Sequence, residues 1–245
     1  VDVFVGNPSG ATWADEFNVD GAPDSTKWNY DLGTGCPNLC GWGNNEAQYY
    51  TNRSDNVIVA NGLLKITAKK ESYQGAQYTS AKIFTKGKFD FKYGTIEIRA
   101  KLPSGPGTWP AIWTLGSNIS SVGWPACGEI DIMEHAGNRQ GTVQSAMHTP
   151  SSNGNTINKG SQFLSTVSTD FHIYKVKWTS EEMVFSVDDV EHYRYNPSNK
   201  NSSTWPFDAN QYLILNVAMG GSFGGAIGPN FTESVMEIDY VRVYQ

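Results

Sequence analysis

The chain has 245 residues, of which 17% are charged and 13% are aromatic, and its formal net charge is −6 at pH 7. This length suits one large all-β domain or two small ones and is ample for a sizeable core. Because Lys and Arg do not cluster and no long apolar run occurs, a nucleic-acid partner, an anionic membrane partner and a transmembrane helix are disfavoured.

The chain begins at Val1, without a basic segment followed by an apolar one. We therefore expect a mature, secreted, extracellular form from which any targeting segment has been removed. Cys36 and Cys40 lie in a loop rich in Gly, Pro and Asn, where a short disulfide fits an oxidising compartment. A zinc site is the weaker alternative, because the third cysteine is distant and no His is near the pair. That third cysteine, Cys127, is interpreted as a small buried residue.

Short alternating runs separated by Gly, Asn, Ser and Pro recur along the chain, whereas long helical periodicity is nearly absent. This pattern is typical of an all-β sandwich or barrel. Asn61 and Gly62 separate the apolar runs 57–59 and 63–67 and so predict a hairpin.

The middle of the chain continues this pattern. Alternating runs at 88–92 and 96–101 predict strands with one buried face. Residues 102–128 are rich in Gly, Pro and Trp, which predicts a long functional loop with a short strand around 111–113. Further strands are predicted at 143–148, 174–178, 183–187, 212–218 (covered on both faces) and 235–244.

Neither repeats nor linkers interrupt the chain, so residues 1–245 are predicted to form a single domain. Residues 220–224 fit the nucleophile-elbow pattern G-x-S-x-G, but that motif needs a following helix, which residues 225–229 cannot supply. We interpret the segment as a loop that lines a cleft. The four His residues show no metal-binding spacing.

Three carboxylates occur in the apolar, β-prone stretch 128–135. Side chains of a regular strand alternate between faces, so Glu129 and Asp131 share one face and Glu134 points away. One extra residue, Ile132 or Met133, would return Glu134 to their face, and β-bulges are over-represented beside active sites. We therefore predict a bulged strand that presents all three carboxylates to one cleft.

Paired carboxylates are the groups that hydrolyse glycosidic bonds, and retaining enzymes hold them about 5–5.5 Å apart. Same-face neighbours on a strand have Cα atoms roughly 6.6–6.8 Å apart, which is close to that scale. Asp131, between the other two, would raise the pKa of a neighbour and help keep Glu134 protonated while Glu129 stays ionised. A calcium site or a solvated sheet face is the alternative, disfavoured because apolar residues mark the opposite face as core.

Residues 129–134 resemble the active-site signature of glycoside hydrolase family 16 in its bulged form, E-x-D-x-x-E. This form is typical of bacterial laminarinases and of some agarases and carrageenases. Six further segments carry the same laminarinase-like resemblance: WGNNE at 42–46, QYYT at 48–51, YTSA at 78–81, WPAIW at 109–113, MHT at 147–149 and IDYVRVY at 238–244.

The resemblance implies a two-sheet antiparallel β-jelly roll with an open concave cleft. It also implies a monomeric, retaining endo-hydrolase that cleaves internal β-1,3-glucosidic bonds of laminarin-type glucans by double displacement. Mixed-linkage glucan, agarose or carrageenan is the alternative substrate, and a non-catalytic glucan-binding module is the alternative class of function.

Roles are implied for individual residues as well. Glu129 would be the nucleophile, Glu134 the acid/base, and Asp131 would assist the nucleophile and modulate proton transfer. The substrate-binding candidates are Trp109, Trp113, Trp124, His148, Asn44 and Glu46. Lys82 departs from the family, which often has Arg there, and puts one substrate contact in doubt.

The family often binds one structural calcium ion through backbone carbonyls and one Asp. The matching positions in this chain are Glu16, Gly62 and Asp239, and oxygen-only ligation fits Ca²⁺. An exposed strand carboxylate is the alternative interpretation of Asp239.

Overall fold

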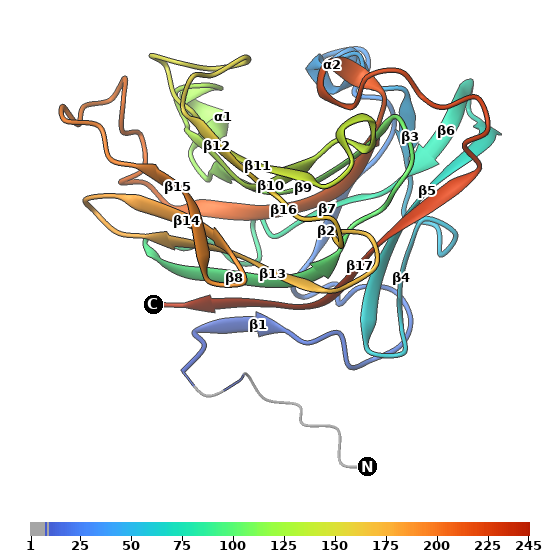
Figure 1. The fold of residues 1–245 in the computed structure, drawn as a ribbon, viewed down its shortest axis with the longest axis horizontal. Helices are drawn as coiled ribbons and strands as arrows, with labels where there is room; N and C mark the ends of the chain where they lie inside the picture. Colours follow the sequence, from blue (N-terminus) through green and yellow to red (C-terminus); the bar gives the residue numbers. More distant parts are fainter. Residues whose placement is uncertain (1–7, 9) are drawn as a thin grey trace.

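A computed structural model describes residue 8 and residues 10–245, so part of the predicted domain 1–245 lies outside the described residues. Two sheets stack face to face, as Figure 1 shows, which confirms the predicted β-sandwich. Among the described residues, no helix is long and apolar enough to cross a membrane.

The larger sheet has ten strands in the order β15-β14-β13-β8-β17-β5-β6-β3, with β1 also paired to β17 and β4 to β5. Its pairs are antiparallel except β3 with β6, which are parallel. The strands are β1 (Trp13–Asp15), β3 (Gln48–Tyr50), β4 (Val57–Ala60), β5 (Leu63–Tyr73), β6 (Ala76–Ser80), β8 (Gly94–Lys101), β13 (His172–Trp178), β14 (Met183–Val187), β15 (Val190–Tyr195) and β17 (Glu233–Tyr244).

The smaller sheet has seven strands in the order β12-β11-β10-β9-β16-β7-β2. They are β2 (Asn29–Asp31), β7 (Lys82–Phe84), β9 (Thr108–Gly116), β10 (Glu129–His135), β11 (Thr142–His148), β12 (Lys159–Phe163) and β16 (Gln211–Met219). The helices are single turns: α1 (Ile119–Val122), α2 (Gly221–Gly224), η1 (Cys40–Gly43) and η2 (Gly137–Arg139).

One large apolar cluster lies between the sheets. Ile66 and Ile98 reach it from the larger sheet, and Ile130 and Leu215 reach it from the smaller one. Burying each such side chain stabilises the fold by about 1.5–3 kcal/mol. Every residue of β16 is buried, as its continuous apolar sequence predicts. Because the apolar cluster covers the inner face of the smaller sheet, the carboxylates lie on its outer face.

Turn chemistry confirms the predicted hairpin. Asn61 and Gly62 both have positive φ values and join the antiparallel strands β4 and β5. An Asn-Gly pair adopts such angles at low cost, and its twist matches that of the flanking strands.

The strand predicted at 88–92 is wrong. Residues Thr85–Phe89 form a turn, and only Phe91 makes an isolated bridge, to Gln211. Phe89 instead stacks on both Trp13 and Phe91. The alternation of aromatic residues therefore reflects ring packing and not a β-ladder.

The loop predicted for 102–128 is interrupted by a longer strand than expected, because β9 covers nine residues, Thr108–Gly116. The pairing of β9 with β10 ends at Ala111, whereas its pairing with β16 continues past Pro110. Pro110 is thus locally at an edge of the ladder, where a strand tolerates proline. Trp109 consequently lies on a strand and not in a loop, whereas Trp113 lies on a strand as predicted.

Candidate active site

Strand β10, which carries the three carboxylates, contains the predicted bulge. Against β11, Asp131 pairs with Ala146 and Glu134 with Gln144, so two residues of β10 face one residue of β11. Against β9, Met133 pairs with Ile112 and Asp131 with Trp113, which leaves Ile132 as the extra residue.

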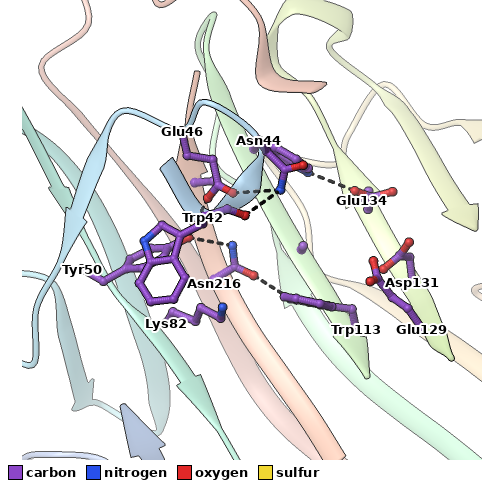
Figure 2. Close-up of a pocket in the computed structure, with 13 residues that line it drawn as sticks. Trp42, Asn44, Glu46, Tyr50, Lys82, Trp113, Glu129, Asp131, Glu134 and Asn216 are labelled. Atoms are coloured by element: carbon purple, nitrogen blue, oxygen red, sulfur yellow. Dashed lines mark hydrogen bonds between the residues drawn. The ribbon is translucent and has the colours of Figure 1, made fainter. Parts of the chain in front are cut away.

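The bulge returns Glu134 to the outer face of the sheet. Ile132 and Met133, although consecutive, both belong to the core between the sheets. Glu129, Asp131 and Glu134 all line one pocket on the opposite face, and Figure 2 shows the three carboxylates along β10. A regular strand would have directed Glu134 into the core.

Glu134 lies on the pocket wall with few polar partners. Its side chain is 8% exposed. The indole Nε1–H of Trp109 donates to Oε1 at 3.1 Å, and Gln144 Nε2 donates to Oε2 at 3.4 Å. Burial, followed by the charge of Glu129, raises the pKa of Glu134 to about 7. Glu134 can therefore carry a proton in near-neutral solution.

Glu129 and Asp131 form the other end of the carboxylate group. Trp124 Nε1–H donates to Glu129 Oε2 at 2.7 Å. His148 Nε2 lies 2.9 Å from Asp131 Oδ2 and 3.7 Å from Glu129 Oε1. Trp124 is 46% exposed.

Burial of this pair acts against the expectation that Glu129 stays ionised. Burial and the neighbouring Asp131 raise the pKa of Glu129 well above its usual range, and burial and Glu134 do the same for Asp131. Three buried carboxylates cannot all ionise together, so they retain protons between them. Against these two effects, the charge of His148 lowers the pKa of Glu129 and so favours its ionised form.

Trp42 and Lys82 lie across the pocket from the three carboxylates, as Figure 2 shows. Lys82 Nζ lies 4.4 Å from the ring centre of Trp42 and 5.3 Å from that of Trp113, and pairs with Asp31 at 3.0 Å. Each cation–indole contact stabilises this arrangement by about 0.5–2 kcal/mol. Lys82 therefore organises two indoles of the cleft, although it lacks the planar fork of Arg.

A hydrogen-bonded chain fixes the floor of the pocket. Trp113 Nε1–H donates to Asn216 Oδ1, and Asn216 Nδ2 donates to the hydroxyl of Tyr50. Glu46 accepts bonds from Gln48, Tyr50 and Asn44. Burial raises the pKa of Glu46. The predicted binding residues Asn44, Glu46, Trp109 and Trp113 thus line the same pocket as the carboxylates.

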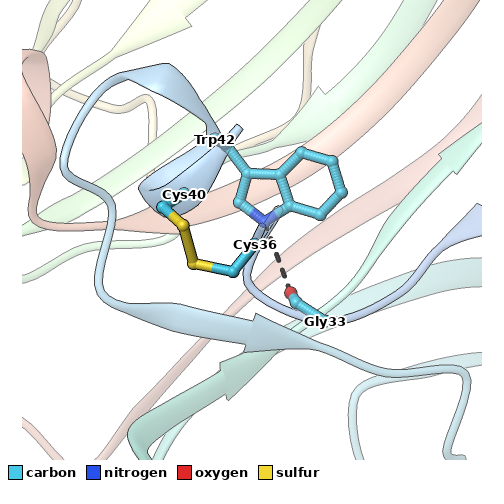
Figure 3. Close-up of a disulfide and its surroundings, with 4 residues drawn as sticks. All are labelled: Gly33, Cys36, Cys40 and Trp42. Atoms are coloured by element: carbon cyan, nitrogen blue, oxygen red, sulfur yellow. Dashed lines mark hydrogen bonds between the residues drawn. A yellow bond between two sulfur atoms is a disulfide. The ribbon is translucent and has the colours of Figure 1, made fainter. Parts of the chain in front are cut away.

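A disulfide joins Cys36 and Cys40, so the disulfide alternative is confirmed and the zinc alternative is wrong. Trp42 lies two residues after Cys40, and its indole Nε1–H donates to the carbonyl of Gly33 at 3.3 Å (Figure 3). Trp42 has φ +53°, an uncommon backbone conformation for a bulky residue. The cross-link therefore restrains the turn that presents Trp42 to the cleft. Cys127 is a free, buried thiol, as predicted.

The segment with the nucleophile-elbow pattern holds only the single turn α2, and no helix follows it. A Cβ atom on Gly221 would lie 2.9 Å from the Asn44 carbonyl and 3.2 Å from both Glu46 and Trp109. Its positive φ of +72° also favours glycine. The loop thus packs against the pocket residues, in keeping with its predicted place beside the cleft.

Trp42, Tyr50 and Asn216 line the pocket but were not among the candidate site residues from the sequence. Asn216 had a usable signal, because it is the one polar residue in the apolar run 212–218. Trp42 and Tyr50 lie in the segments 42–46 and 48–51 that carry the family resemblance, so those segments could have pointed to them.

Asp239 lies on β17 of the larger sheet, and Glu16 and Gly62 directly adjoin the ends of its strands β1 and β5, away from the carboxylates. Both β5 and β1 pair along the edge of β17 that β8 does not occupy: Leu64 opposes Ile238, and Asp15 opposes Val241. The ends of those strands therefore bring the three residues to one region of that edge.

Comparisons with known proteins agree with this geometry. The profile of the family described as "Glycosyl hydrolases family 16" matches residues 44–242. A β-glucanase of Rhodothermus marinus is 45% identical, over 95% of this chain and 84% of the relative. Two further curated relatives are longer, and the chain spans 40% and 33% of their lengths.

Solved structures share the fold over nearly the whole chain. A laminarinase from Flavobacterium sp. UMI-01 has a TM-score of 0.91 and 48% identity, covering 96% of this chain and 100% of that one. SCLam, a non-specific endo-β-1,3(4)-glucanase crystallised with a glucan oligosaccharide, has a TM-score of 0.90 and 44% identity, covering 97% and 96%. The predicted jelly roll is confirmed.

The hydrogen bond from Trp109 lowers the pKa of Glu134 against the effect of burial. We therefore expect Trp109→Phe to move that pKa above about 7, as measured by NMR titration of ¹³C-labelled glutamate carboxyls. Trp113→Phe is the matched control, because its indole donates to Asn216 and not to a carboxylate. Equal shifts in both variants, or a fall in Trp109→Phe, would contradict this assignment.

Proposed function

The chain belongs to glycosyl hydrolase family 16, and we propose that it is a monomeric, endo-acting, retaining hydrolase of β-1,3-glucans. The observation that carries the proposal is the bulge at Ile132, which brings Glu129 and Glu134 into one pocket. The β-glucanase and laminarinase relatives support the substrate class.

In the first step Glu129 attacks the anomeric carbon as Glu134 gives its proton to the glycosidic oxygen. A covalent glycosyl–enzyme intermediate forms, and the shortened glucan leaves with the proton. The pKa of about 7 at Glu134 keeps that proton available up to near-neutral pH. An acid is most effective when its pKa lies near the working pH.

In the second step the now ionised Glu134 takes a proton from water, and the water oxygen displaces Glu129 from the anomeric carbon. Asp131 lies between the two. It is 2% exposed, so a change in its charge during the reaction is costly. His148, next to both Asp131 and Glu129, balances the charge that Glu129 regains as it leaves.

The breadth of the substrate range is a second question within this function. SCLam, 44% identical, is non-specific for β-1,3(4)-glucans. The intact carboxylate trio, with donors to Glu129 and Glu134 in place, favours an enzyme over a binding module, which has no need of these contacts. We propose laminarin as the main substrate and mixed-linkage glucan as a minor one.

Substitution of the two outer carboxylates tests the assignment. We expect Glu134→Gln to lower kcat on laminarin by about 10²–10⁴-fold, the range of general acid catalysis. It should spare kcat/KM for aryl β-laminaribiosides with acidic phenol leaving groups, because their first step needs little protonation, whereas the second step still lacks its base. Glu129→Gln should abolish turnover of both substrates, because even a good leaving group does not compensate for the loss of the nucleophile.

The control for these variants is Glu191→Gln on the exposed strand β15, where the same change leaves the pocket untouched. Reducing-end release is measured on laminarin, lichenan and agarose, and NMR of the first product should show the β-anomer. An initial α-anomer, or parent turnover in Glu129→Gln, would refute the double displacement.

We also propose a structural calcium ion at the edge of β17. The residues fit in position, because the strand register gathers Glu16, Gly62 and Asp239 there. The Glu16 carboxylate pairs with Arg242 at 2.9 Å, which leaves its backbone carbonyl as the ligand. Asp239 Oδ2 accepts a bond from Arg99 at 2.6 Å, so its other oxygen would face the ion. The ion would tie β1 and the β4–β5 turn to β17.

Removal of calcium should lower the melting temperature, and adding CaCl₂ back should restore it, because the ion binds the folded chain. Asp239→Asn should lose this difference between EDTA and CaCl₂, whatever its absolute stability. An identical melting temperature for the parent protein in EDTA and in CaCl₂ would rule the site out.

We further propose that the protein is secreted and works outside the cell. The Cys36–Cys40 disulfide supports an oxidising compartment. Three reactive thiols in the denatured, unreduced protein, instead of one from Cys127, would contradict this proposal.

A further inference from the structure

The bulge has its own hydrogen-bond partner on the side away from the carboxylates. Ser145 of β11 is the single residue that faces Ile132 and Met133 of β10. Its hydroxyl donates to the carbonyl of Ile132 at 2.7 Å. Because a bulge leaves its extra residue outside the regular ladder, this side chain takes the place of a missing backbone bond.

A second residue orients that hydroxyl. His192 Nε2 lies 2.8 Å from Ser145 Oγ. A serine hydroxyl has one proton, which goes to Ile132, so Ser145 accepts from the His192 Nε2–H. Burial lowers the pKa of His192 and keeps this imidazole neutral. Ser145 itself is 0% exposed, so no bulk solvent competes for its hydroxyl.

His192 reaches Ser145 from the other sheet. It lies on β15, the outermost strand of the larger sheet, whereas Ser145 lies on β11 of the smaller one. Between them is Gly160 of β12, which pairs directly with Ser145. Directly opposed residues share a face, so any side chain at position 160 would occupy this space. A Cβ there would lie 2.7 Å from the His192 carbonyl oxygen, so the glycine admits His192.

The three residues lie behind the catalytic face. Val143 and Met147, which flank Ser145 at alternate positions of β11, belong to the core cluster. Gln144, on the other face, reaches Glu134. Neither Ser145 nor His192 lines the substrate pocket. An effect of either residue on catalysis is therefore indirect.

We propose that Ser145 and His192 are positioning residues, which lock the Ile132 bulge and thereby hold Glu134 opposite Glu129. This inference rests on the proposed glucanase function and deepens it. Loss of the hydroxyl leaves the buried Ile132 carbonyl unpaired. The strand can then recover ladder bonds by moving toward regular register, and that movement turns Glu134 away from Glu129.

Ser145→Ala should lower kcat on laminarin by about 10–100-fold with little change in KM, because a displacement near 1 Å costs this much. The basic limb of its pH profile, which follows the pKa of Glu134, should also move, because burial and the distance to Glu129 both set that pKa. His192→Ala should show the same changes to a smaller degree. The double variant should match Ser145→Ala alone, because His192 acts through the serine.

Val143→Ala is the matched control, as it removes buried atoms from the same face of the same strand. It should lower the melting temperature and leave kcat and the basic limb at parent values. If Ser145→Ala loses only stability, or the two single effects add, the positioning role is refuted. If Ser145→Ala does not fold, His192→Ala decides: parent kcat and pH profile would overturn the proposal. A parent protein inactive on laminarin would instead refute the proposed function.

Discussion

A β-strand alternates its side chains between two faces, and the chemistry of this protein depends on breaking that alternation once. Glu129 and Asp131 have the same parity, and Glu134 has the opposite one. The extra residue, Ile132, restores Glu134 to the outer face while Ile132 and Met133 both stay in the core. Core packing and carboxylate placement are therefore satisfied by the same distortion.

The electrostatics of the site follow from this crowding. Three carboxyls on one short strand are buried together, and burial and mutual repulsion raise the pKa of each. Their differences come from neighbours: Trp109 donates to Glu134, whereas His148 lies beside Asp131 and Glu129. Charge can thus pass between Glu129 and Glu134 during the reaction without three anions forming at once.

Local patterns in the sequence predicted the parts of the fold that local chemistry determines. The hairpin at Asn61 was predicted from its turn residues, and the bulge in β10 was predicted from the odd spacing between Asp131 and Glu134. The alternation around Phe89 misled, because it reflects stacking on Trp13. The pocket wall formed by Lys82, Trp42 and Trp113 could not be predicted from local sequence, because these side chains meet only through tertiary folding.

Covalent trapping tests most directly whether the bulged strand delivers a nucleophile and an acid to one bond. A 2-deoxy-2-fluoro-β-laminaribiosyl fluoride slows both steps, while its reactive fluoride lets the first proceed without the acid. The intermediate therefore accumulates. We predict that peptide mass spectrometry finds one fluorosugar, esterified to Glu129. A label on Asp131 or Glu134, or steady laminarin hydrolysis with no trapped sugar, would contradict the account.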